Sequence, residues 1–299
     1  MHRRQFLESS ALALAATGVA PLFAAETAPV AAAERPLVVF TKMLEKVPAD
    51  ELAEKVAALG VSGIEAPIRA GGHIEPKDVP DKLPAFAEAL KKRGLEITIL
   101  SSDVDQVNAE QEAVLRTAVS LGIKRYRLKH YRYDLKKPIA PQLADVRAKL
   151  IDIAAMNKEL GIQGQYQNHR GNDFVGAPVW DMVSALDGID PAQLGLAFDL
   201  AHATVEGGNA WELNMHRAAQ HIVSVYFKDY RLDGRQWNPC PLGEGSVNPR
   251  SARLVSQLLP AGTPVSIHIE YIGGQDHVAR TFDAMKNDVA TLRKWLAPA

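Results

Sequence analysis

From residue 36 onward, short apolar segments alternate with longer segments whose apolar residues recur at helical spacing. The short segments show no regular alternation of polar and apolar residues. Such segments are typical of strands that are covered on both faces. The expected strands span residues 36–43, 62–68, 95–104, 123–131, 162–169, 193–202, 222–230 and 263–271.

A predicted helix follows each predicted strand. The expected helices span residues 48–59, 82–94, 109–122, 141–161, 177–186, 210–220, 249–260 and 279–296. Eight strand–helix units in succession indicate a parallel sheet, and we predict a single-domain α/β fold, a (β/α)8 TIM barrel, over residues 36–299. The alternative is an open, doubly wound sheet. That fold usually has a glycine-rich phosphate loop after its first strand, and residues 40–51 contain none.

The first residues resemble a targeting segment. An Arg-Arg-x-Phe-Leu motif at positions 3–7 precedes a mildly apolar run and small residues typical of a cleavage site. This arrangement resembles a twin-arginine export signal over residues 1–33, and it predicts a periplasmic or otherwise exported protein. A short membrane anchor is the alternative. Ser, Thr, Gly and Pro21 interrupt the run, so we expect no stable membrane span after the leader is removed.

Composition and charge restrict the function classes. Apolar residues make up 47% of the chain, and the formal net charge is −1 at pH 7. This balance gives no general attraction to nucleic acid or to anionic membranes. Residues 124–137 combine basic residues with tyrosines, a pattern that can bind nucleic acid. Export and the overall charge instead favour a barrel strand with an exposed loop there, and we expect no nucleic-acid partner. The single cysteine, Cys240, can form neither an internal disulfide nor a thiolate zinc site.

Polar residues gather at the carboxyl ends of the predicted strands, where TIM barrels carry their active sites. They are Thr41, Lys42, Glu65, Ser101, Ser102, Asp103, Lys129, His130, Gln167, Asn168, His169, Asp199, His202, Tyr226, Lys228, Asp229, His268 and Glu270. A buried carboxylate is unfavourable unless it is paired. Asp199 and Glu270 each follow an apolar run, so both indicate a functional site. Such a ring of groups suits metal ligation or proton transfer beside a carbonyl.

Several segments together resemble the xylose isomerase-like barrels known as sugar phosphate isomerases and epimerases. They are GIEAPI, KKRGLEITIL, QNHRG, FDLAH, VYFKDY, PLGEGSVNP and IHIEY, in this order along nearly all of the mature chain. The resemblance implies action on a small-molecule carbohydrate. In that family Glu, Asp, His and Glu at the ends of strands five to eight hold a divalent metal, and the two Glu side chains move protons between neighbouring sugar carbons.

The resemblance carries over to this chain only in part. Asp199 and Glu270 match two of the four metal ligands, whereas Gln167 and Tyr226 stand at the other two positions. Gln167 lacks the charge of a carboxylate and cannot take up a proton, and a neutral tyrosine is a poor replacement for imidazole. We expect these four residues to bind Mn²⁺ or Mg²⁺ weakly, with Zn²⁺ and Co²⁺ less favoured, or to bind no metal, unless His169, His202 or His268 supplies a further ligand.

Glu270 is then the remaining carboxylate base and Gln167 an altered catalytic position, and Lys228, Lys129 or His202 is the candidate partner acid. The predicted substrate-binding residues are Glu65, Lys129, His169, His202 and Asp229. One base is enough for β-elimination, or for an enolisation in which the same group returns the proton.

Three functions therefore remain open. The first is a sugar isomerase or epimerase with an altered metal site, and the second is a lyase or hydratase acting on a 3-keto-glycoside. The third is a carbohydrate-binding barrel without catalysis. A homo-oligomer is compatible with each of them. An exported protein seldom meets phosphorylated sugars, so we expect a free or oxidised sugar as the ligand.

Overall fold

A computed structural model describes residues 35–297 of the chain. The predicted export signal in residues 1–33 lies outside the described residues and stays a prediction. Among the helices of residues 35–297, none is both long and apolar enough to cross a membrane.

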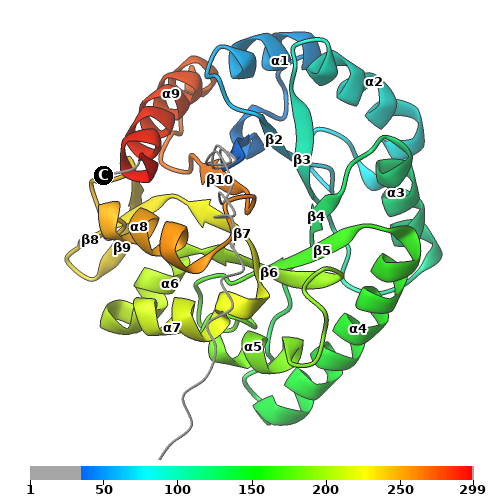
Figure 1. The fold of residues 1–299 in the computed structure, drawn as a ribbon, viewed down its shortest axis with the longest axis vertical. Helices are drawn as coiled ribbons and strands as arrows, with labels where there is room; N and C mark the ends of the chain where they lie inside the picture. The colour runs from blue at the N-terminus through cyan, green and yellow to red at the C-terminus, as the bar shows by residue number, and fades with distance from the viewer. Residues whose placement is uncertain (1–34, 298–299) are drawn as a thin grey trace, which may run out of the picture. The chain divides into compact units, whose positions relative to one another are not determined.

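Eight parallel strands close into a barrel, which confirms the predicted fold class (Figure 1). Around the barrel the strands follow the order β1-β10-β7-β6-β5-β4-β3-β2, so the first and last barrel strands pair with each other. Their bounds are β1 (Leu37–Phe40), β2 (Gly63–Pro67), β3 (Glu96–Ser101), β4 (Arg125–Arg127), β5 (Gln163–Gln167), β6 (Leu194–Asp199), β7 (Ile222–Phe227) and β10 (Val265–His268).

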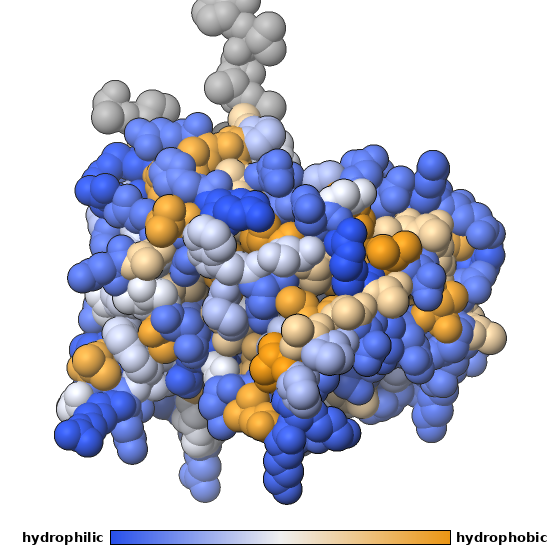
Figure 2. Space-filling view, turned by 90° about the horizontal axis from the view of Figure 1, so that it is seen from below, coloured by the Kyte–Doolittle hydropathy of each residue, from blue (hydrophilic) through white to orange (hydrophobic). Residues whose placement is uncertain are grey.

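Helices surround the barrel and cover the outer face of its sheet (Figure 1). The α-helices are α1 (Ala49–Ala57), α2 (Val79–Lys91), α3 (Ala109–Ser120), α4 (Ile139–Leu160), α5 (Trp180–Leu186), α6 (Leu200–Gly207), α7 (Trp211–Ala218), α8 (Pro249–Leu258) and α9 (His277–Leu296). Short 3-10 helices span Lys42–Leu44, Pro76–Asp78, Gly208–Ala210 and Ala219–His221. On the face seen in Figure 2, hydrophilic side chains cover most of the surface, and apolar side chains lie between them in small groups.

Successive side chains of each strand point alternately toward the helices and into the barrel. Leu196 and Phe198 of β6 belong to the large apolar core, whereas Ala197 belongs to a small separate cluster with Ile99 and Tyr226. Much of what points inward is polar. Fully buried polar residues on the barrel strands include Glu65, Ser101, Gln165, Asp199, Ser224 and Ser266. The apolar pattern of the strands therefore reflects mainly their packing against the helices.

A two-stranded antiparallel hairpin follows β7 and was not anticipated from the sequence. It consists of β8 (Asp229–Asp233) and β9 (Gln236–Cys240). Asp233 pairs with Gln236, so the two-residue turn is Gly234-Arg235, and Gly234 has a φ of 60°. A glycine at the first position of a two-residue hairpin turn is a hairpin signal, because that position needs a residue that tolerates positive φ. The residues between the seventh predicted strand and the next helix thus contained a readable signal.

The end of β6 also differs from the predicted strand over residues 193–202. The strand ends at Asp199 and helix α6 begins at Leu200. Asp199 is the N-cap of α6, and its side chain accepts a hydrogen bond from the backbone N–H of His202. This capping contact satisfies a helix N–H that has no partner within the helix. It also aims the Asp199 carboxylate at the barrel mouth.

Candidate active site

Asp199 is the fully buried carboxylate at the centre of the barrel mouth. Oδ1 accepts the His202 backbone N–H at 3.0 Å. Oδ2 accepts Nε2–H of Gln167 at 2.7 Å and lies 3.2 Å from Nζ of Lys228. An isolated carboxylate would be strongly unfavourable here, so the ammonium and the two N–H donors explain how its charge is accommodated.

Lys228 directly follows β7 and connects the two carboxylates of the mouth. Its side chain is 3% exposed, and Nζ also donates a hydrogen bond to Oε2 of Glu270 at 3.3 Å. Burial alone would lower the pKa of Lys228, but Asp199 and Glu270 outweigh burial and raise the pKa above its ordinary value. Lys228 is therefore an ammonium at neutral pH.

Glu270 lies two residues after β10 and is the more accessible of the two carboxylates. Oε2 accepts hydrogen bonds from Lys228 and from the hydroxyl of Tyr230, the latter at 3.0 Å. Its side chain is 21% exposed, and Oε1 accepts no hydrogen bond from residues 35–297. Burial opposes ionisation, but Lys228, together with His268, Lys42 and Tyr230, lowers the pKa of Glu270 well below its usual range. Glu270 thus presents an ionised carboxylate with one open oxygen.

Gln167, the last residue of β5, is held in a single orientation by its two neighbours. Nη1–H of Arg127 donates a hydrogen bond to Oε1 of Gln167 at 3.0 Å, while Nε2–H of Gln167 points to Asp199. A guanidinium only donates hydrogen bonds and a carboxylate only accepts them, so this arrangement satisfies both ends of the amide. The side of Gln167 that faces Asp199 is therefore a donor.

Glu65, predicted to bind substrate, is fully buried inside the barrel. Its carboxylate accepts hydrogen bonds from the hydroxyls of Ser101 and Ser266 and from Nε–H of Arg127, and it contacts Nε2 of His268 at 2.9 Å. Burial would raise the pKa of Glu65, but His268, Arg127 and Ser101 together lower it to about 2. These contacts occupy the carboxylate, so Glu65 acts as the ionic centre of the barrel interior.

Tyr226 lies opposite Asp199 in the strand register, yet its hydroxyl has a different partner. Nε2–H of Gln165 donates a hydrogen bond to the Tyr226 hydroxyl at 2.9 Å, and the ring packs 4.4 Å from that of His268. Burial and the neighbouring Glu65 raise the pKa of Tyr226 well above its ordinary value. A neutral phenol bound to Gln165 is not prepared to ligate a metal.

Three histidines form a row across the mouth. The ring of His169 lies 4.8 Å from that of His130 and 4.1 Å from that of His202, between ring centroids. Both ring nitrogens of His202 are buried and have no hydrogen-bond partner in the described part of the chain. Burial, reinforced by Lys228, lowers the pKa of His169 to about 4 and that of His202 well below its ordinary value. The neutral imidazole of the part-buried His169 can exchange hydrogen bonds with sugar hydroxyls, whereas Nε2 of the buried His202 lies 3.6 Å from Oδ2 of Asp199.

The remaining predicted substrate residues lie at the rim. Asp229 accepts hydrogen bonds from the backbone N–H groups of Tyr230, Gly243, Gly245 and Val247, all at 2.8–2.9 Å. These donors occupy its oxygens and tie the loop after β9 to the end of β7.

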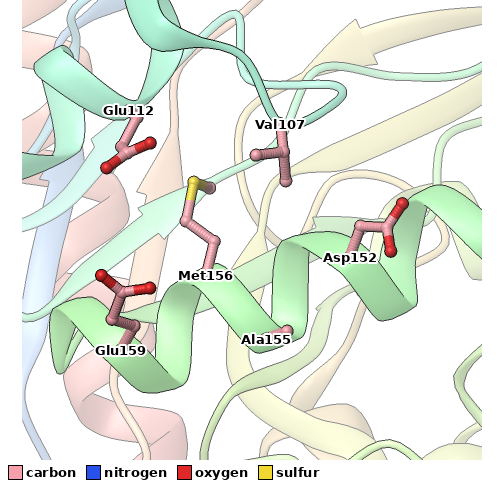
Figure 3. A pocket seen from close by; sticks show the side chains of 6 residues that line it. All are labelled: Val107, Glu112, Asp152, Ala155, Met156 and Glu159. Atoms are coloured by element: carbon pink, nitrogen blue, oxygen red, sulfur yellow. The ribbon is translucent and has the colours of Figure 1, made fainter.

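Two hollows lie near or beyond the rim. Lys129, two residues after β4, lines a hollow of about 200 Å³ together with Ser102 and Asp103. Another, of about 420 Å³, lies on the outer helices α3 and α4 (Figure 3). It is lined by Val107, Glu112, Asp152, Ala155, Met156 and Glu159. None of the predicted site residues lines this outer hollow.

The donor set does not fit the divalent metal that the family resemblance implies. Of the four predicted ligand positions, Gln167 turns an N–H toward Asp199, Tyr226 is bound to Gln165, and the Lys228 ammonium lies beside both carboxylates. Across residues 35–297, no three His, Cys, Asp or Glu side chains are arranged as metal ligands. Divalent cations such as Mg²⁺ and Mn²⁺ need several oxygen or imidazole donors with lone pairs directed at one point.

Arg127 and Tyr230 belong to the site, although sequence reasoning did not single them out. Arg127 is the last residue of the short strand β4 and belongs to the basic segment 124–137, and only its inward direction links it to Gln167 and Glu65. Tyr230 directly follows the Lys228-Asp229 pair and reaches Glu270. An inward-facing arginine on a strand two places from β2, which carries Glu65, was the available signal.

Comparisons with known proteins agree with this architecture. The model of a family described as xylose isomerase-like TIM barrel matches residues 53–295. A xylose isomerase domain protein from Planctomyces limnophilus is 16% identical with a TM-score of 0.65, and the alignment covers 88% of this chain and 99% of that one. The comparison with curated proteins found no match.

Two further solved structures are similar. The probable 3-DHS dehydratase from Bacillus anthracis is 14% identical with a TM-score of 0.66, covering 86% of this chain and 98% of that one. The 3-keto-D-glucoside 4-epimerase from E. coli is 13% identical with a TM-score of 0.65, covering 87% of this chain and 100% of that one. At these sequence identities the similarity shows a shared fold only.

Proposed function

The chain belongs to the xylose isomerase-like TIM barrel family, and we propose that it is a sugar isomerase or epimerase that transfers a proton next to a carbonyl group. The observation that carries this proposal is the pairing of Glu270 with Lys228. One supplies an ionised carboxylate with an open oxygen, and the other supplies a buried ammonium within 3.3 Å of it. A base beside a fixed positive charge is what enolisation requires.

In the proposed reaction, Oε1 of Glu270 removes a proton from the carbon next to the substrate carbonyl. The electrons of the broken C–H bond form a C=C bond, and the carbonyl π electrons move to oxygen. Lys228 donates an N–H to that oxygen. As negative charge grows on the substrate oxygen, this oxygen competes with Glu270 for the Lys228 ammonium. Glu270 therefore becomes a stronger base as the enolate forms. Glu270 then returns the proton to the same carbon or to the former carbonyl carbon. For the second outcome Lys228 gives a proton to the enolate oxygen, and the hydroxyl of the first carbon gives its proton to Lys228 as that C–O bond becomes the new carbonyl.

The residue at position 167 favours some outcomes over others. Gln167 cannot accept a proton, so Glu270 is the carboxylate with an open oxygen beside Lys228. A single base can move a proton between neighbouring carbons on one face of an enediol, which gives isomerisation. Inversion at one carbon needs a second proton donor on the opposite face.

The same single base supports a second candidate, a lyase or hydratase acting on a 3-keto-glycoside. Once Glu270 has removed the proton next to the ketone, the enolate can expel the substituent on the β carbon, and the released oxygen takes up a proton. No opposing base is required for this step. The export signal predicted in residues 1–33 also supports a periplasmic substrate without phosphate, such as a free or oxidised sugar.

Incubation in D2O tests the proposal. Purified protein is mixed with ketohexoses and with 3-keto-glycosides, and NMR follows deuterium uptake and release of the aglycone. Exchange without aglycone release supports the isomerase, and release supports the lyase. Binding without either outcome supports a carbohydrate-binding barrel and overturns the enzymatic proposal.

The Glu270→Gln variant identifies the base. It keeps the size of the side chain but removes the proton acceptor, so we expect at least about a 100-fold loss of exchange. Glu88→Gln, at an exposed position on α2, is the matched control and retains the wild-type rate. Exchange that persists in Glu270→Gln removes Glu270 from the mechanism.

A further inference from the structure

The Lys228 ammonium lies nearly midway between two carboxylates that come from distant strands. Nζ is 3.2 Å from Oδ2 of Asp199 and 3.3 Å from Oε2 of Glu270. Asp199 ends β6 and Glu270 follows β10, so the cation connects two parts of the barrel that β7 separates. The side chain of Lys228 is 3% exposed, so the ammonium belongs to the packed mouth.

We propose that the Lys228 ammonium is the resident cation of this site and replaces a divalent metal, so that the protein works without one. The inference rests on the proposed function for the role of Lys228 in the reaction. Its statement about metal binding stands on the geometry alone.

The charges of the mouth support a single built-in cation. Asp199 and Glu270 carry one negative charge each, and Lys228 places one positive charge between them. A divalent ion approaching the two carboxylates would have to displace the ammonium or lie beside it. The repulsion between the ion and the ammonium is strong in a buried site, because the effective dielectric constant there is low.

The hydrogen bonds around Asp199 also suit an ammonium better than a metal. Oδ2 of Asp199 already receives Nε2–H of Gln167 at 2.7 Å, and Arg127 fixes that amide from behind. A metal at Oδ2 would face this donor N–H and gain no lone pair from Gln167. An ammonium can donate to Oδ2 of Asp199 together with the Gln167 N–H, because a carboxylate oxygen can accept two hydrogen bonds.

An ammonium supplies chemistry of its own. It carries three N–H donors, and two of its contacts are to carboxylates, which leaves one donor for a substrate oxygen. It stabilises negative charge on that oxygen as a fixed cation. It can also protonate the oxygen, which a metal ion cannot do. Asp199 acts here as the positioning residue that keeps Lys228 in place.

Mn²⁺ binding tests the inference without relying on activity. The full chain is treated with EDTA and titrated with Mn²⁺, and electron paramagnetic resonance measures free and bound ion. We expect the wild type to show no stoichiometric binding. In Lys228→Ala the two carboxylates lose their cation, and Mn²⁺ affinity should rise by at least about tenfold. Lys228→Arg retains the charge and should bind no better than the wild type.

Further variants make the outcome decisive. Asp199→Asn combined with Lys228→Ala should lose the gained affinity, because one of the two carboxylates is neutralised. If Lys228→Ala does not fold, Lys228→Met carries the same test with a side chain of closer length. Stoichiometric Mn²⁺ binding by the wild type overturns the inference. So does the absence of any gain in Mn²⁺ affinity in Lys228→Ala and Lys228→Met. Exchange in D2O is measured in parallel, and its absence in the wild type contradicts the proposed function while leaving the metal result interpretable.

Discussion

Arg127 and Gln167 are joined by a hydrogen bond of 3.0 Å from Nη1–H to Oε1, and this contact decides what Gln167 offers to the barrel mouth. With its oxygen engaged by the guanidinium, Gln167 directs its N–H group to Asp199 at 2.7 Å. Arg127 also binds Glu65 at 3.2 Å. One arginine thus links the ionic interior of the barrel to the carboxylates of the mouth.

Replacing Arg127 by Met should destabilise the protein by about 3 kcal/mol, because Glu65 loses an ion-pair partner in a fully buried position. Urea unfolding measures the change. The double variant Arg127→Met, Glu65→Gln removes the unpaired charge and should recover part of the loss. If the loss of unfolding free energy in the double variant equals the sum of the losses in the two single variants, the coupling between Arg127 and Glu65 is absent.

The Tyr230→Phe variant should weaken catalysis while leaving the fold intact. The Tyr230 hydroxyl donates to Oε2 of Glu270 at 3.0 Å, so its removal leaves Lys228 as the main partner of that oxygen. We expect about a 3- to 30-fold lower rate of D2O exchange and a change in unfolding free energy of about 1 kcal/mol or less.

Tyr133→Phe provides the matched control for that variant. Tyr133 donates a hydrogen bond to Asp181 at 2.8 Å, away from the predicted catalytic residues. Its exchange rate should equal that of the wild type. An equal loss of rate in both variants would mean that the effect of Tyr230→Phe does not arise at Glu270.

Asp229→Asn should loosen the loop between β9 and α8. Asp229 accepts backbone N–H groups from Gly243, Gly245 and Val247, and an amide nitrogen in place of one carboxylate oxygen cannot accept. We expect a destabilisation of about 1–3 kcal/mol and faster hydrogen exchange of these amides. Glu244→Gln, an exposed change in the same loop, should leave the exchange rates unaltered, and protection that persists in Asp229→Asn would refute this role.

Asp288 of α9 should make stability depend on pH. Burial raises its pKa to about 7 from an ordinary value of 3.8, despite hydrogen bonds from the Leu242 backbone and the Tyr271 hydroxyl. The folded state thus binds a proton that the unfolded state releases, so stability falls as pH rises from about 4 to 7. Asp288→Asn removes this dependence and should be about 2–4 kcal/mol more stable than the wild type at pH 8.

At pH 4 the two proteins should differ little, since the carboxyl group is then protonated in the folded state. Thermal unfolding across this pH range measures the difference. Asp283→Asn, at an exposed position of the same helix, is the control and should track the wild type at every pH. A constant difference between Asp288→Asn and the wild type would rule out titration of Asp288 as the cause.

The sequence by itself determined the barrel and the residues at its mouth. Apolar strands covered by helices produce a pattern that is visible in one dimension, and chain direction in a parallel barrel brings strand ends such as Asp199 and Glu270 to one rim. It also identified the substitutions at Gln167 and Tyr226, because residue type alone fixes charge and proton-accepting capacity.

Only the tertiary structure decided how these side chains pair. Lys228 and Glu270 are separated by 42 positions and Arg127 and Gln167 by 40, so no local pattern reveals their contacts. The same holds for Glu65, whose partners Ser266 and His268 lie across the seam where β1 and β10 close the barrel. Whether a polar residue faces substrate or a buried partner depends on the strands beside it, and barrel closure sets those neighbours.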